Sequence, residues 1–88
     1  MSAHRTKLNF ADRLRTIFRE GVLSVDYAQN LVVIKTISGS AHVAGEAIDS
    51  LKWPEVVGTI SGDNTLLVIA QSAQDADTLM HKFEQMKK

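Results

Sequence analysis

The sequence predicts an α+β fold. We expect a ββαββα two-layer sandwich, a four-stranded sheet with helices on one face, plus an N-terminal linker helix. Four runs rich in Val, Ile and Leu are bounded by turn residues, as is typical of strands, and they come in two pairs. Each pair is followed by a segment that repeats apolar residues at helical spacing. Two hairpins joined by a helix give one mixed or antiparallel sheet.

The N-terminal helix is expected from Asn9, as its N-cap, to Gly21, which stops it. Its apolar residues follow the i, i+4, i+7, i+8 spacing of one helix face and are Phe10, Leu14, Ile17 and Phe18. A stripe of such large side chains needs a surface to cover. We therefore expect this helix either to pack on the sheet or to lead from a preceding domain.

The remaining elements follow from the same patterns. Strands are expected at residues 22–27, 31–37, 55–60 and 64–70, and helices at 41–51 and 73–87. The first strand alternates, with Leu23, Val25 and Tyr27 predicted on one face.

Serines are expected to begin both later helices. The segment Ser38-Gly39-Ser40 offers N-caps to the second helix, and Ser72 with Asp75 resembles a capping box at the third. The second helix should end before Pro54, because the residue that precedes a proline is driven out of the helical region.

The segment 58–65 is the most polar and tightest connection in the chain. Asp63-Asn64 follows Gly62 between two apolar runs, which predicts a hairpin turn, because Gly, Asp and Asn all accept positive φ. The open question is whether this turn also binds a ligand.

The charges balance overall but are unevenly placed. The 88 residues hold 10 Lys and Arg against 10 Asp and Glu, and the basic excess lies in residues 1–20. A neutral domain lacks the concentrated basic face that DNA phosphates require, so we do not expect it to bind DNA alone. The basic segment could touch an acidic partner or form a solvated helix face.

Composition excludes several further classes. There are no cysteines, so disulfides and thiolate metal sites are excluded. No apolar run approaches the ~20 residues of a membrane span, and no signal-peptide core follows Met1. We expect a cytoplasmic protein without a membrane partner.

The central strands predict a partner for the sheet. Residues 31–34 and 66–70 are apolar on both faces, whereas a sheet open to water on one side normally alternates. An uncovered apolar face would favour a homo-oligomer. The alternative is that the N-terminal helix folds over that face within one chain.

One polar row on the second helix is a candidate site. His42, Glu46 and Asp49 fall at i, i+4 and i+7, a row that could bind a metal but has no metal-ligand spacing signature and is typical of a solvated helix face. Asp49 lies in the last turn, where a negative charge opposes the helix dipole, and such a residue often meets a ligand. No nucleophile elbow or phosphate-binding loop occurs, so we do not expect an enzyme.

The chain resembles the C-terminal domain of bacterial arginine repressors over about residues 20–88. The matching segments, in order, are Val25-Asp26-Tyr27, residues 31–36, Gly39-Ser40-Ala41-His42, Ile48-Asp49-Ser50-Leu51 and residues 53–65. The resemblance implies a ββαββα domain at 21–88 that forms trimers, which stack into a hexamer. Residues 1–20 resemble the linker after the family's winged helix-turn-helix domain, which we expect to be missing here; operator DNA would be bound only through that domain.

The resemblance also implies a ligand site without a metal or other cofactor. L-Arginine would bind as corepressor between trimers, with Asp63, the first Asp of the family's Gly-Asp-Asp motif, on the guanidinium. His42 and Asp49 would hold the amino-acid end, and Thr59 and the backbone of Ser61 would line the pocket.

Asn64 departs from the family, which usually has a second Asp at this position. An asparagine loses the charge and presents an amide donor to a guanidinium that itself only donates. We therefore expect weaker arginine binding, or assembly with a paralogue that has the more complete arginine site. The alternative functions are an effector-insensitive assembly module of a divergent paralogue and a small enzyme on the same plan.

Overall fold

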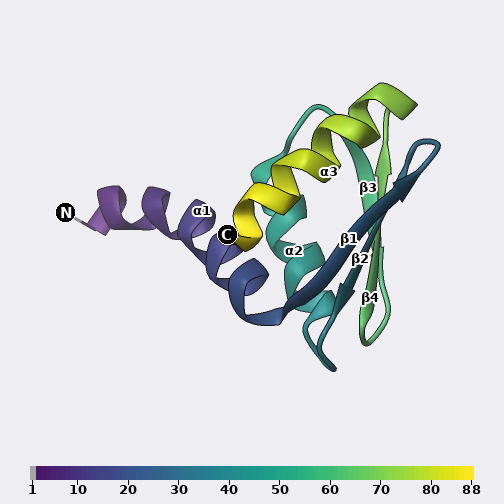
Figure 1. The fold of residues 1–88 in the computed structure, drawn as a ribbon. Coiled ribbons are helices and arrows are strands. Elements are labelled where there is room, and N and C mark those ends of the chain that lie inside the picture. The colour runs from purple at the N-terminus through teal and green to yellow at the C-terminus, as the bar shows by residue number, and fades with distance from the viewer. Residues whose placement is uncertain (1) are drawn as a thin grey trace.

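The computed structural model describes the backbone of residues 2–88 and the side chains of residues 12–88. Its elements follow the predicted order (Figure 1). They are α1 Ser2–Gly21, β1 Val22–Ala28, β2 Leu31–Thr36, α2 Ala41–Leu51, β3 Val56–Ser61, β4 Thr65–Ala70 and α3 Ala73–Lys87. Only α1 departs from its predicted bounds by more than one residue.

All four strands form one antiparallel sheet in the order β1-β2-β4-β3. The two hairpins meet where β2 pairs with β4, so β1 and β3 are the edge strands. Helices α2 and α3 cover one face of this sheet (Figure 1). The predicted α+β sandwich is therefore confirmed, and each edge strand keeps a row of backbone groups that the sheet does not pair.

The core lies between the sheet and the helices. Alternate residues of the central strands point into it, as the two-residue period of a strand requires. The largest fully buried side chains are Leu14, Phe18, Val32, Ile34, Ile48, Leu66, Val68, Leu79 and Phe83. Burial of each stabilises the fold by about 1.5–3 kcal/mol before the entropic cost of ordering the chain.

The predicted start of α1 is wrong. The helix begins at Ser2, so Asn9 lies inside it and is not its N-cap. Residues 2–8 contain neither Gly nor Pro, so nothing in them interrupts the helical hydrogen bonds. Phe10, predicted on the apolar stripe, lies outside the described side chains.

The second half of α1 packs on the helical layer. Leu14 and Phe18 are fully buried, and the Phe18 ring stacks on Phe83 with 5.2 Å between ring centroids. The contacts of α1 are chiefly with α2 and α3 (Figure 1). Leu14 and Phe18 of the stripe are therefore covered, but by helices rather than by the sheet.

The predicted alternation of β1 is correct for two of its three residues. Val25 and Tyr27 pair with Ile34 and Val32, whose side chains face the helices. A register shift between Val22 and Ser24 leaves Leu23 outside this alternation and 61% exposed. An extra residue in a bulge reverses the face of the side chains before it, which sequence periodicity does not reveal.

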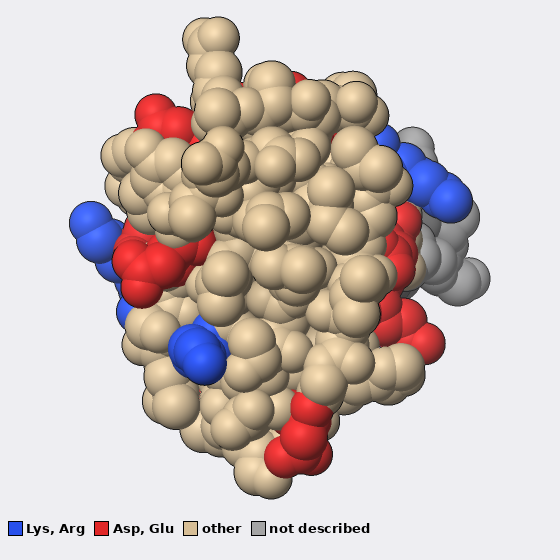
Figure 2. Space-filling view, turned by 90° about the vertical axis from the view of Figure 1, so that its right-hand side faces the viewer, with Lys and Arg blue, Asp and Glu red and all other residues tan. Residues whose placement is uncertain are grey.

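The centre of the opposite face of the sheet is apolar, and this face carries no helix among the described residues. By strand register it presents Leu31, Val33, Leu67 and Ile69, all half-buried, and Ile60, which is 63% exposed. Figure 2 shows this open face as a broad surface whose charged side chains lie mostly toward its margin. The alternative in which the N-terminal helix covers it is wrong, because α1 packs on α2 and α3.

Candidate functional site

Helix α2 and edge strand β3 lie side by side, and a glycine sets their separation. A Cβ added at Gly45 would lie 2.5 Å from Ser61 Oγ and 3.5 Å from Thr59 Oγ1. Both hydroxyls belong to the helix-facing side of β3, opposite Leu66 and Val68 of β4. The missing side chain of Gly45 therefore lets the hydroxyl groups of β3 approach the helix.

Asp49 is held by one of these hydroxyls. Thr59 Oγ1 lies 3.0 Å from each carboxylate oxygen of Asp49, and its hydroxyl group donates a hydrogen bond that the two oxygens share. Helix α2 has no basic residue in its last turn, so this donor compensates part of the unfavourable meeting of Asp49 with the helix dipole. No cation lies within 4.0 Å of this carboxylate among the described residues.

Asp63 is fixed at the other end of α2. Its Oδ2 accepts a hydrogen bond of 2.7 Å from Ser38 Oγ. Its main-chain oxygen accepts from the backbone N–H groups of Gly39 at 3.0 Å and Ala41 at 3.4 Å. The tip of the β3–β4 hairpin is therefore bonded to the start of α2.

These bonds correct the predicted cap of α2. Ser40 is the N-cap residue, but its backbone is helical, with φ −94° and ψ −15°, and its side chain makes no capping bond. The main-chain oxygen of Asp63 takes that role from 22 residues further along the chain. At α3 the prediction is confirmed, because Ser72 Oγ accepts from Asp75 N at 3.1 Å.

The hairpin turn is present, but not for the predicted reason. Gly62 N donates to Thr65 O at 2.8 Å, which closes a two-residue loop of Asp63 and Asn64. Neither loop residue has a positive φ, and neither does Gly62; in the described chain that conformation occurs at Gln29, Gly39 and Lys52. The bonds from Asp63 and Asn64 to the β2–α2 connection hold the loop instead.

Asn64 and His42 both have exposed polar side chains. Asn64 Oδ1 accepts from Thr65 Oγ1 at 3.2 Å, and its main-chain oxygen accepts from Thr36 N at 2.8 Å. That leaves the amide N–H groups of Asn64 exposed. His42 is exposed in the first turn of α2, three residues before Gly45 and therefore on the same helix face.

The polar row on α2 does not converge on one point. Asp49 bonds to Thr59, whereas Glu46 borders a separate hollow together with Arg13 of α1. Across the described residues no group of three or more His, Cys, Asp or Glu side chains is close enough to hold a metal ion.

Two residues of the site were not predicted. Ser38 was considered only as a helix cap, and its bond to Asp63 joins residues 25 apart. Gly45 was placed inside a helix without a role, although a glycine in a helix interior is itself a signal of close approach. The structure thus brings the predicted residues into two groups along one edge, Asp49 with Thr59, and Asp63 with Asn64, and it places Ser61 beside Gly45.

The fold and the edge define a small α+β domain that presents exposed, hydroxyl-bound carboxylates beside an uncovered apolar sheet. Residues 18–85 match the sequence pattern of "Arginine repressor, C-terminal domain". The chain belongs to this family.

Proteins called arginine repressor match most of the chain. The one from Thermoanaerobacter sp. (strain X514) is 46% identical over 80 residues, 91% of this chain and 53% of that protein. The one from Ruminiclostridium cellulolyticum is 50% identical over 78 residues, 89% and 52%. The one from Clostridium acetobutylicum is 44% identical over 81 residues, 92% and 54%. The chain spans about half the length of these curated relatives.

In the described residues, no helix combines the length and the apolar character needed to cross a membrane.

Proposed function

We propose that this chain is the effector-binding and hexamerisation domain of an arginine-dependent transcriptional repressor that regulates genes of arginine metabolism. L-Arginine is the corepressor, bound between two facing trimers. Residues 21–88 form the arginine-binding and oligomerisation domain, and residues 1–20 form the linker helix. Operator DNA is bound in the cytoplasm by a winged helix-turn-helix domain on the N-terminal side of this linker.

The observation that carries the proposal is the pair formed by Asp49 and Thr59. A carboxylate held by a neutral hydroxyl at 3.0 Å, without a cation within 4.0 Å among the described residues, is oriented but keeps its charge. Such a group suits the α-amino group of an amino acid, because a charge-assisted hydrogen bond is roughly twice as strong as a neutral one. A hollow of about 230 Å³ opens beside Asp49.

The second carboxylate suits the other end of arginine. Ser38 and the two backbone bonds hold Asp63 at the exposed hairpin tip. In the proposed hexamer this tip projects toward a facing subunit. A guanidinium presents a planar fork of donors that a carboxylate matches. His42 and Ser61 complete the contacts with the amino-acid end and the wall of the pocket.

The open face of the sheet provides the trimer contact. It exposes Leu31, Val33, Ile60, Leu67 and Ile69 to solvent in the single chain. Burial of each apolar side chain contributes up to about 1.5–3 kcal/mol, so several per subunit suffice to drive assembly. Arginine between trimers then neutralises facing carboxylates, and ligand binding and hexamer assembly strengthen one another.

Arginine titration by calorimetry, with light scattering on the same samples, tests the proposal. We expect saturable binding and a shift from trimer to hexamer as arginine is added. Asp49→Asn should weaken binding by about tenfold or more, because it removes one charged acceptor. Glu46→Gln removes a charge from the same helix away from the site and should leave binding unchanged. Equal losses in the two variants would contradict the assignment.

Asn64 sets the strength of the site in this proposal. The amide donors of Asn64 face guanidinium donors, so Asn64→Asp should tighten arginine binding by about 10- to 100-fold. If the native chain neither binds arginine nor changes its oligomeric state with it, the effector-insensitive assembly module is the better description.

A further inference from the structure

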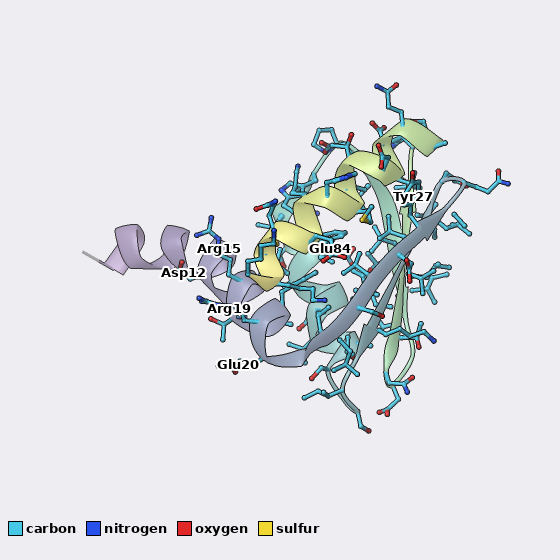
Figure 3. The ribbon with its side chains drawn as sticks, in the orientation of Figure 1. Asp12, Arg15, Arg19, Glu20, Tyr27 and Glu84 are labelled. Carbon is cyan, nitrogen blue, oxygen red and sulfur yellow. The ribbon has the colours of Figure 1, made fainter. Side chains whose placement is uncertain are left out.

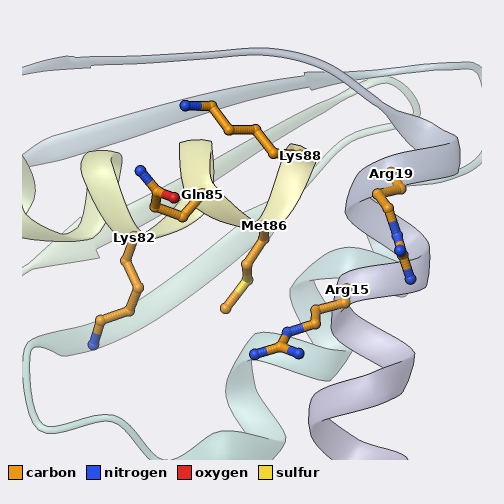
Figure 4. A pocket seen from close by; sticks show the side chains of 6 residues that line it. All are labelled: Arg15, Arg19, Lys82, Gln85, Met86 and Lys88. Carbon is orange, nitrogen blue, oxygen red and sulfur yellow. The ribbon is translucent and has the colours of Figure 1, made fainter.

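A second hollow differs in charge from the proposed arginine site, because basic side chains line it. It occupies about 420 Å³ between α1 and the C-terminal end of α3 and is bordered by Arg15, Arg19, Lys82, Gln85, Met86 and Lys88. Figure 4 shows the α1 and α3 side chains on two sides of this cationic hollow. Four of its six lining residues are basic and none is acidic.

In the described part of the chain, the two arginines have no carboxylate partner. Arg15 and Arg19 are exposed, lie one turn apart on α1 and make no ion pair within 4.0 Å among the described residues (Figure 3). Residues 1–11 contain no Asp or Glu that could pair with them. Like charges at i, i+4 repel one another, although Arg19 also lies in the last turn of α1, where the helix dipole favours a cation.

Lys82 adds a cation that is already positioned. Its Nζ lies 4.3 Å from the Trp53 ring centroid and 3.5 Å from Glu55 Oε2. Trp53 stacks in turn on Phe83, with 5.8 Å between centroids. The aromatic stack therefore holds the ammonium group of Lys82 over the indole of Trp53, at the border of the hollow.

We propose that the cationic hollow binds a phosphate-bearing anion. Two guanidinium groups on one helix face offer paired N–H donors that match phosphate oxygens, and the two lysines add point charges. The phosphates come either from a free polyphosphate or from the backbone of DNA, the polyanion that a transcriptional repressor meets. This site is independent of the arginine site, whose charge is of the opposite sign.

The single tryptophan gives a direct test. An anion in the hollow draws Lys82 away from the indole of Trp53, so the emission of Trp53 should change saturably as ligand is added. Sodium tripolyphosphate and a short DNA duplex are titrated separately, and calorimetry on the same solutions detects binding that the indole does not report. Saturation by the first ligand alone identifies a free polyphosphate, and saturation by the duplex identifies DNA. Either result supports the proposal.

Variants of α1 separate a site from general charge. Arg15→Gln and Arg19→Gln should each raise the dissociation constant about tenfold, and Arg15→Lys should restore part of the loss. Arg13→Gln removes the same charge from the same helix, at the hollow beside Glu46, and should have little effect. With the duplex, log K falls with log salt, and each lost phosphate contact should reduce the steepness of this fall by about 0.9.

Three results would overturn the proposal. They are the absence of saturable binding by both ligands in both measurements, equal weakening by Arg13→Gln and Arg15→Gln, and equally tight binding of an oligoglutamate peptide. The last result would assign the hollow to an acidic protein segment instead.

Discussion

Replacement of Gly45 by alanine tests whether helix α2 must approach strand β3 as closely as it does. The added Cβ would lie 2.5 Å from Ser61 Oγ and 3.0 Å from Leu66 Cδ1. Both distances are shorter than ordinary van der Waals contact, so either the two neighbours or the helix must move. Since Thr59 is on the same side of β3, a displaced helix would also disturb its bond to Asp49.

Two opposing terms set the size of the effect. Alanine is favoured over glycine in a helix interior by about 1 kcal/mol. Overpacking of a filled site costs about 1–3 kcal/mol. We therefore expect Gly45→Ala to lower the free energy of unfolding by up to about 2 kcal/mol. Ser61→Ala removes the atom nearest to the added Cβ and leaves only the mobile end of the Leu66 side chain in close contact. In the Ser61→Ala variant, Gly45→Ala should therefore cause almost no loss of stability.

Urea unfolding at one fixed protein concentration measures both effects, because assembly would otherwise shift the midpoint. Gly58→Ala is the matched control: an added Cβ there meets no atom within 4 Å, and its stability should be unchanged or slightly raised. The reasoning is refuted if Gly45→Ala alone stabilises the protein by the full helix-propensity gain. It is equally refuted if the effect of Gly45→Ala is the same with and without Ser61→Ala.

Three further predictions concern other parts of the molecule. The charge of Asp77 and a hydrogen bond to it raise the pKa of Tyr27 above 10.0, so the stabilisation from this pair is lost as pH rises through that raised pKa. Asp77→Asn should return the pKa toward 10.0 in an absorbance titration of the single tyrosine; an unchanged curve would exclude the contact. Ile60→Asp, on the open face, should yield a folded monomer by light scattering and circular dichroism, whereas a persistent trimer would place that contact elsewhere. Ser38→Ala should release the Asp63 side chain and weaken arginine binding by about two- to tenfold in calorimetry, and unaltered affinity would remove Ser38 from the site.

The fold was accessible from sequence because its signals are local. Apolar residues at helical spacing marked α2 and α3, and alternating or apolar runs bounded by turns marked the strands. The start of α1 was not accessible, because Asn9 satisfies the composition of an N-cap while the preceding residues are equally able to remain helical. The bulge at Leu23 left no mark on the alternation either.

The candidate site divides in the same way. Asp49 was identifiable from its unfavourable place at the end of a helix, and Asp63 and Asn64 from a polar turn between apolar strands. Their partners Thr59 and Ser38 are 10 and 25 residues away, and no local pattern pairs residues at such separations. The structure supplies those pairs, but the ligand they hold is our proposal.

By itself, the sequence determined the order and type of the elements, the membership of the arginine repressor family and the apolar character of both faces of the central strands. Only the tertiary structure decided that α1 packs on the helical layer and that no described helix covers the other face of the sheet. It also decided that the main chain of Asp63 caps α2 and that the basic residues of α1 meet those of α3 around one hollow. The physical reason is that periodicity and turn chemistry act over a few residues, whereas caps, close approaches and charge clusters depend on which distant segments the shared core brings together.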